Sequence, residues 1–405
     1  MHRRFKAWRD SKRHSCQRTP QDPEMPRLPN PRPYALTPSP SQEQIATLAE
    51  TAPFFRLPLE LRRKILIHAF GKRTVHIDLV LTHPLREPLN EERSSYRSTN
   101  PAYRFDNDAG HLWPYTKENL GLDKSRPKYW QWRGCVCHRL PPPRFKIPLD
   151  FHSYIKPGDD RCCEGWAAYC ALWTKRSDKP DCCWIGAMGW LLTCHQAYIE
   201  GTEVLYGTNT IHMSSKPLLT NLSTLIPPRS LSLISSLEPV FWLDTHEHQG
   251  TAIPNLQQLE KYLLILDIHF PRLLSLHIGL RLDLPIIEDT RTKIKRRHAY
   301  VWDMLQSIDA FVQRRCEQRE FGHLRDPLLL SISQSAYKDF QNEVRHNDQY
   351  YVKKSGVQVW RPLSPGQFVL DDEGEIANAT ANNGYWIWGD YEDRYEMEKR
   401  PLAMY

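Results

Sequence analysis

Alternating helix-like and strand-like patterns run through most of the chain, and this alternation limits the possible folds more than any other feature. Strands are indicated by short apolar runs at 75–81, 210–213, 237–243, 274–282, 328–333, 357–361 and 385–388. Helices are indicated where apolar residues recur every three or four positions, over 188–206, 216–225, 255–268, 298–318 and 335–345. Such alternation is typical of α/β proteins. We therefore expect an α/β fold with a largely parallel, irregular leucine-rich-repeat-like sheet.

The pattern fails between residues 83 and 183, where Pro, Trp, Gly, Asp and Arg follow one another without a helical or strand period. Seven of the thirteen tryptophans lie between positions 113 and 190. This aromatic content argues against simple disorder. We interpret 83–183 as a loop-rich, Cys- and Trp-rich insertion in a single domain spanning 54–390, followed by a C-terminal tail at 391–405.

The N-terminal 50 residues have the composition of a tail. Residues 1–18 contribute +6 of the net charge of +7, and residues 20–40 contain eight prolines. Proline blocks helix interiors and sheet pairing, so we expect a disordered, basic and proline-rich tail over 1–50. An import signal or a transit peptide is the alternative. A nucleic-acid-binding domain carries its basic face on the folded body, so nucleic acid is not an expected partner.

One basic run lies inside the body, Arg291-Thr-Lys-Ile-Lys-Arg-Arg297. We interpret it as a solvated loop before a helix, with a nuclear-import or phosphate-contacting patch as the alternative. No run of about 18 apolar residues is present, so we expect no membrane-spanning helix. The N-terminus lacks the apolar core of a secretory signal. An intracellular location, in cytoplasm or nucleus, is therefore expected.

Ten cysteines occur, eight of them between positions 135 and 194. In an intracellular protein they are expected to be reduced. Cys135-Val-Cys137-His138, Cys162-Cys163 and Cys182-Cys183 raise the question of zinc. Adjacent cysteines and a CxC pair do not match the spacing of two to four residues that zinc sites use. We therefore predict free thiols, no structural zinc and no cofactor.

A short segment near the start of the body carries a recognisable motif, Leu57-Pro-Leu-Glu-Leu-Arg-Arg-Lys-Ile65. It predicts a helix over 58–70, with a buried stripe of Leu61, Ile65 and Ala69, and with Arg62 and Lys64 in solvent. The segment resembles the opening of an F-box, whose pattern is Leu-Pro-x-Glu followed by apolar positions. A complete F-box continues with two more helices, whereas here a strand-like segment follows Phe70.

A second motif begins at Trp190 and reads WLLTCHQAYIEGTEVLYGTNTIH through His212. Together, in this order, the two motifs resemble a family of filamentous-fungal proteins that share an F-box-like start and a domain of unknown function. In that family, Arg usually stands at the position of His195. The resemblance covers about residues 54–390. It implies a protein-binding role, with a ubiquitin-ligase adaptor of the Skp1 type as a possible partner.

We find no glycine-rich phosphate loop, nucleophile elbow or HExxH helix. The sequence therefore favours a non-enzymatic protein–protein interaction module, with the partner site at Leu57, Pro58, Glu60, Leu61 and Ile65. The alternative is a zinc-binding regulator or metal-dependent enzyme that uses the 135–183 cysteines or His246 and His248, with Asp244 or Glu247 as a further ligand. The sequence does not indicate an oligomeric state.

Overall fold

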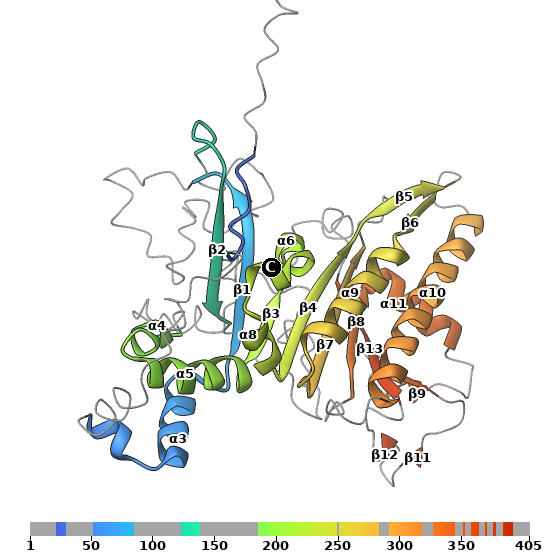
Figure 1. Ribbon diagram of the computed structural model, residues 1–405. Helices are drawn as coiled ribbons and strands as arrows, with labels where there is room; N and C mark the ends of the chain where they lie inside the picture. Colours follow the sequence, from blue (N-terminus) through green and yellow to red (C-terminus); the bar gives the residue numbers. More distant parts are fainter. Residues whose placement is uncertain are drawn as a thin grey trace, which may run out of the picture.

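The computed structural model (Figure 1) describes residues 22–29, 52–84, 123–137, 185–248, 251–282, 291–317 and 327–344, and five short pieces, 351–352, 358–363, 369–370, 376–377 and 384–391. The protein is a mixed α/β structure built on a nine-stranded sheet in the order β2-β1-β3-β4-β7-β8-β13-β10-β9. Among the described residues, no helix is both long and apolar enough to cross a membrane.

Six neighbouring strands of this sheet are parallel. They are β1 (Thr74–Thr82), β3 (Thr210–Met213), β4 (Ser236–Leu243), β7 (Ser275–Leu282), β8 (Leu329–Ser333) and β13 (Gly384–Tyr391). At the edges, β2 (Tyr129–Val136) pairs antiparallel with β1, and β10 (Gln358–Pro362) pairs antiparallel with β13 and with β9 (Tyr351–Val352). The largely parallel α/β sheet is thus confirmed, whereas its likeness to leucine-rich repeats remains a prediction.

Two short ribbons lie outside the main sheet. They are β5 (Thr245–His248) with β6 (Thr251–Pro254), and β11 (Val369–Leu370) with β12 (Ile376–Ala377). The helices are α3 (Leu59–Phe70), α4 (Ala187–Leu191), α5 (His195–Gly207), α6 (Lys216–Thr220), α7 (Leu222–Leu225), α8 (Pro228–Leu233), α9 (Leu256–His269), α10 (Arg291–Glu317) and α11 (Gln334–Val344). A 3₁₀ turn, η2 (Pro53–Arg56), precedes α3.

Three local expectations are corrected. The basic run 291–297 is the first part of α10 and not a loop, because the helix is continuous from Arg291 to Glu317. Within the described part of 83–183, residues 129–136 form a strand, β2, which pairs with β1 at the edge of the sheet. The single helix expected over 188–206 is two helices, because Cys194 is extended and caps the N-terminus of α5.

The two faces of the sheet differ in chemistry because alternate residues of a strand point to opposite sides. On one face, apolar side chains such as Leu237, Phe241 and Leu276 pack beneath the helices. Phe241 stacks on Tyr262 of α9, with ring centroids 4.6 Å apart. This face and the helices above it form the main hydrophobic core.

The opposite face carries a buried polar row, with His76, His212, Glu238, His277 and Ser331 on successive strands. The rings of His76 and His212 lie 4.4 Å apart, and His212 Nδ1 lies 3.6 Å from a Glu238 oxygen. His277 Nε2 and Ser331 Oγ are 2.6 Å apart. The polar side chains of this face thus form two groups of neighbours, one on β1, β3 and β4 and the other on β7 and β8.

A buried side chain, Asn209, joins the sheet to α3 and α5. Its Nδ2 donates to the carbonyls of Phe70 and Leu205, the last turns of α3 and α5, each at 2.9 Å. Its Oδ1 accepts from the backbone N–H of Arg73, just before β1, at 2.8 Å. One amide thereby satisfies carbonyls at two helix ends that lack partners within the helices.

Asp78 makes a comparable junction where β3 leads into α6. Its carboxylate accepts from the backbone N–H groups of Ser214 and Ser215, both at 2.7 Å. Burial raises the pKa of Asp78, against the lowering effect of these hydrogen bonds.

The turn from α3 into β1 requires glycine at position 71. A Cβ there would lie 2.7 Å from Thr208 Oγ1 and 2.9 Å from the backbone of Ile67. We predict that Gly71→Ala destabilises the protein by about 1–3 kcal/mol, because Thr208 and the backbone of Ile67 would have to move away from the added methyl group. Thermal unfolding measures this. The matched control is Gly189→Ala in α4, where no atom lies within 4 Å of the added carbon; an equal loss in both variants would contradict the prediction.

Candidate partner-docking helix

Helix α3 forms where the first motif predicts it. Pro58 occupies the N-cap position, and Glu60 places a carboxylate in the first turn, where the helix dipole favours negative charge. The helix ends as the N–H of Gly71 donates to the carbonyl of Ile67. These local signals are sufficient to set both ends of the helix.

The inner face of α3 is formed by Leu66 and Phe70, each 3% exposed. With Ala187 of α4 and Val204 of α5 they form a small hydrophobic core of their own. The expectation that Leu61, Ile65 and Ala69 form the buried stripe is therefore wrong, since all three are exposed. Leu66 and Phe70 are also four residues apart, so the helix carries two possible apolar stripes, and packing on α4 and α5 selects this one.

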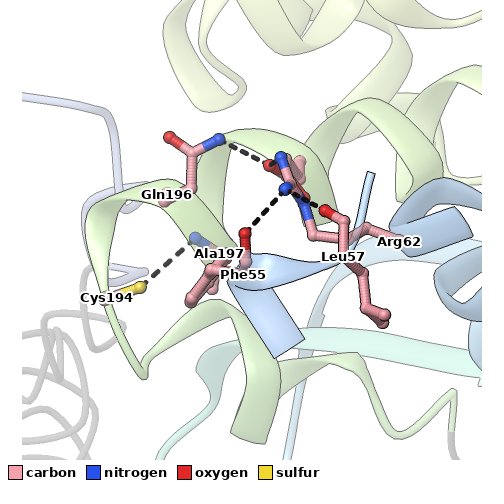
Figure 2. A network of polar contacts seen from close by, with 7 residues as sticks. Phe55, Leu57, Arg62, Cys194, Gln196 and Ala197 are labelled. Carbon is pink, nitrogen blue, oxygen red and sulfur yellow. Dashed lines mark hydrogen bonds and ion pairs between the residues drawn. The ribbon is translucent and has the colours of Figure 1, made fainter. Parts of the chain in front are cut away.

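Arg62, expected in solvent, lies at the centre of the contact with α5 (Figure 2). Its Nη2 and Nε donate to the two oxygens of Glu200 at 2.7 and 3.0 Å. Its Nη1 donates to the carbonyls of Leu57 and Phe55 at 2.7 and 3.1 Å. Gln196 donates to the same carboxylate. The guanidinium therefore ties α3 to α5 and also fixes the chain that enters α3.

Aromatic rings close the other side of this contact. Phe54 meets Trp190 edge-on with ring centroids 4.6 Å apart, and Phe55 lies 5.9 Å from the same indole. The Arg62 guanidinium lies 5.9 Å from the ring of Phe55. The segment before α3 is thus packed as well as hydrogen-bonded.

The second motif supplies the surface on which α3 rests. Cys194 caps α5 by accepting from the N–H of Ala197 at 3.4 Å, as Figure 2 shows. Gly201 lets α4 approach, because a Cβ would lie 2.5 Å from Leu191. Together with Glu200 and Asn209, these residues give most of the motif a structural role. The two motifs, far apart in sequence, form one packed unit.

The outer face of α3 is exposed. Leu61 and Ile65, four residues apart, are 45% and 46% exposed, and Lys64 and His68 share this face by helical spacing. Leu59, in the first turn, is 55% exposed. We call Leu61, Lys64, Ile65 and His68 the outer face of α3. It combines an apolar pair with positive charge.

Four of the five residues predicted as a partner site are exposed, and the fifth is half-buried. Pro58, Glu60, Leu61 and Ile65 are exposed on α3. Leu57 is half-buried, and its carbonyl accepts from Arg62. Sequence reasoning missed Arg62 and Glu200, the residues that hold the helix. The signal that the sequence contains is the position of Arg62, one helical turn before Leu66 and two before Phe70, which places it on the buried face.

The alternative metal site gains no support from the described part of the chain, where no group of three or more His, Cys, Asp or Glu side chains is arranged to hold a metal. Asp244 instead binds Lys216, with Nζ 2.8 Å from Oδ1. Cys135 on β2 and Cys137 just after it are buried. The cysteines at 162–183 and the side chains of His246 and His248 lie outside the described residues.

No protein-family model matches the chain, and comparisons with curated proteins and with solved structures likewise find no match. The family resemblance therefore rests on the two motifs themselves and remains a proposal.

We predict that Arg62→Ala destabilises the protein by about 3–5 kcal/mol, because it leaves the Glu200 carboxylate buried without its partner. The matched control is Arg63→Ala, whose side chain is exposed on the same helix and whose loss should change stability by less than about 0.5 kcal/mol. Chemical denaturation of both variants measures the difference. Equal stabilities would show that the ion pair does not hold α3.

Proposed function

We propose that the protein is a non-enzymatic interaction module that docks a protein partner through the outer face of α3. The observation that carries this proposal is the exposure of Leu61 and Ile65 on a helix whose inner face is already packed and hydrogen-bonded. A paired apolar surface at i and i+4 is the usual anchor when a helix enters a groove on a partner.

Charge around this face indicates the chemistry of the partner. Lys64 lies on this face, and Arg56, Arg63 and Lys72 are exposed elsewhere on and beside α3, against Glu60 as the exposed acid of the same segment. A partner with an apolar groove and an acidic rim would complement this surface. With the F-box-like motif, this favours an Skp1-type adaptor, which would make the protein a substrate adaptor of a ubiquitin ligase.

We predict that Leu61→Ala with Ile65→Ala weakens binding to a purified Skp1-type adaptor by at least about tenfold, since buried apolar anchors contribute most of the energy of such contacts. Because both side chains are exposed in the free protein, thermal stability should change little. Isothermal titration calorimetry and thermal unfolding of the same preparations test both statements.

The matched control is Leu264→Ala with Ile268→Ala on α9, a second exposed apolar pair at i and i+4. It should leave adaptor binding unchanged. If the wild-type chain does not bind the adaptor, the adaptor proposal is wrong. If both double variants lose binding equally, the outer face of α3 is not the docking site.

A further inference from the structure

A short proline-containing segment, residues 22–29, lies against the body within the N-terminal region expected to be a tail. It reads Asp-Pro-Glu-Met-Pro-Arg-Leu-Pro, with proline at every third position. Met25 and Leu28, also three residues apart, are half-buried, whereas the other six residues are exposed. The N–H of Arg27 donates to the carbonyl of Met25 at 2.8 Å, which closes a tight turn at Pro26 between the two half-buried side chains. The segment therefore binds through its two apolar side chains. The remainder of 1–50 lies outside the described residues.

This segment lies beside the edge strands β2 and β1 of the nine-stranded sheet (Figure 1, dark blue). The indole Nε1 of Trp130, on β2, donates to the carbonyl of Pro23 at 2.8 Å. The carbonyl of Thr224, on α7, accepts from the N–H of Leu28 at 2.7 Å. Met25 packs against the main hydrophobic core. We call the surface between Trp130 and Thr224 the strap groove.

The elements that line the strap groove have their own supports. β2 pairs with β1 along its whole length, from Tyr129 to Val136. Two residues of α7, Leu222 and Leu225, are buried in the main core. Residues 22–29 add neither a helix nor a strand to the fold. They contact the body as a bound peptide would. The Trp130 indole donates to the carbonyl of Pro23, the N–H of Leu28 donates to the carbonyl of Thr224, and two apolar side chains are half-buried.

Surfaces that offer an indole N–H and apolar contacts recognise proline-containing peptides, because proline already restricts the backbone and less conformational freedom is lost on binding. We propose that the strap groove is a binding site for proline-containing segments with apolar side chains at i and i+3, and that residues 22–29 are its tethered resident ligand. This site is separate from the outer face of α3. A segment of the same pattern in another protein would compete for it.

The first test uses the wild-type full-length chain. Trypsin can cleave after Arg27, within the bound segment, and mass spectrometry follows that single cleavage. The probe is a synthetic peptide of residues 22–29 carrying Arg27→Gln, which trypsin cannot cut. If the groove exchanges ligands, millimolar peptide should accelerate cleavage after Arg27 several-fold. The same peptide with Met25→Asp and Leu28→Asp should have no effect. Unchanged cleavage with the first peptide would overturn the proposal.

The second test measures binding directly in full-length variants. Met25→Asp with Leu28→Asp should release the segment in the chain, so that a fluorescent 22–29 peptide binds at least about tenfold more tightly than to the wild type, whose groove is occupied. Adding Trp130→Phe removes the indole N–H and should weaken peptide binding about 2- to 10-fold. The control, Glu24→Ala with Arg27→Ala, changes exposed positions and should behave as wild type. A folded release variant that does not bind the peptide would contradict the proposal.

Discussion

The ion pair between Arg62 and Glu200 is the interaction on which the helical end of this protein depends. The side chains are 14% and 7% exposed, and charges so far from water are tolerated only when they are paired and hydrogen-bonded. Here the carboxylate accepts from Arg62 and Gln196, while the guanidinium also donates to two carbonyls that precede α3. The pair fixes both the position of α3 and its rotation, and the rotation leaves Leu61 and Ile65 in solvent.

This arrangement explains how two distant motifs can act as one unit. The first provides α3, and the second provides the end of α4, all of α5 and Asn209, which connects the ends of α3 and α5 to β1. The small core around Leu66 and Phe70 is distinct from the main core beneath α9 and α10. A helix carried on its own small core, yet anchored to a large sheet, can present an apolar pair without using it for the fold. This is the physical basis for proposing a docking role.

The sequence predicts the strands and long helices well because their apolar patterns are local. Val75–Leu81, for example, is fully contained in β1. The rotation of α3 could not be predicted in this way. Its two apolar stripes, one through Leu61 and Ile65 and the other through Leu66 and Phe70, are equally regular. The choice between them depends on packing against α4 and α5 and on Glu200, 138 positions from its partner Arg62.

Other differences have similar causes. β2 lies in a region without a clear period because its position on the sheet edge leaves Tyr129 and Trp132 exposed. The polar row from His76 to Ser331 is spread over five strands, so its members adjoin one another only after the sheet has formed. In the proline-containing segment, composition indicated an extended chain, and only the fold supplies Trp130 and Thr224 as its contacts.

The most direct test of the central claim is a double-mutant cycle with Arg62→Ala, Glu200→Ala and the combined variant, measured by urea denaturation. If the pair holds α3 against α5, the two changes should be coupled by about 1.5–3 kcal/mol, with the double variant less destabilised than the sum of the single ones. Additive effects would contradict the account, because they would mean that each side chain stabilises the protein independently of the other.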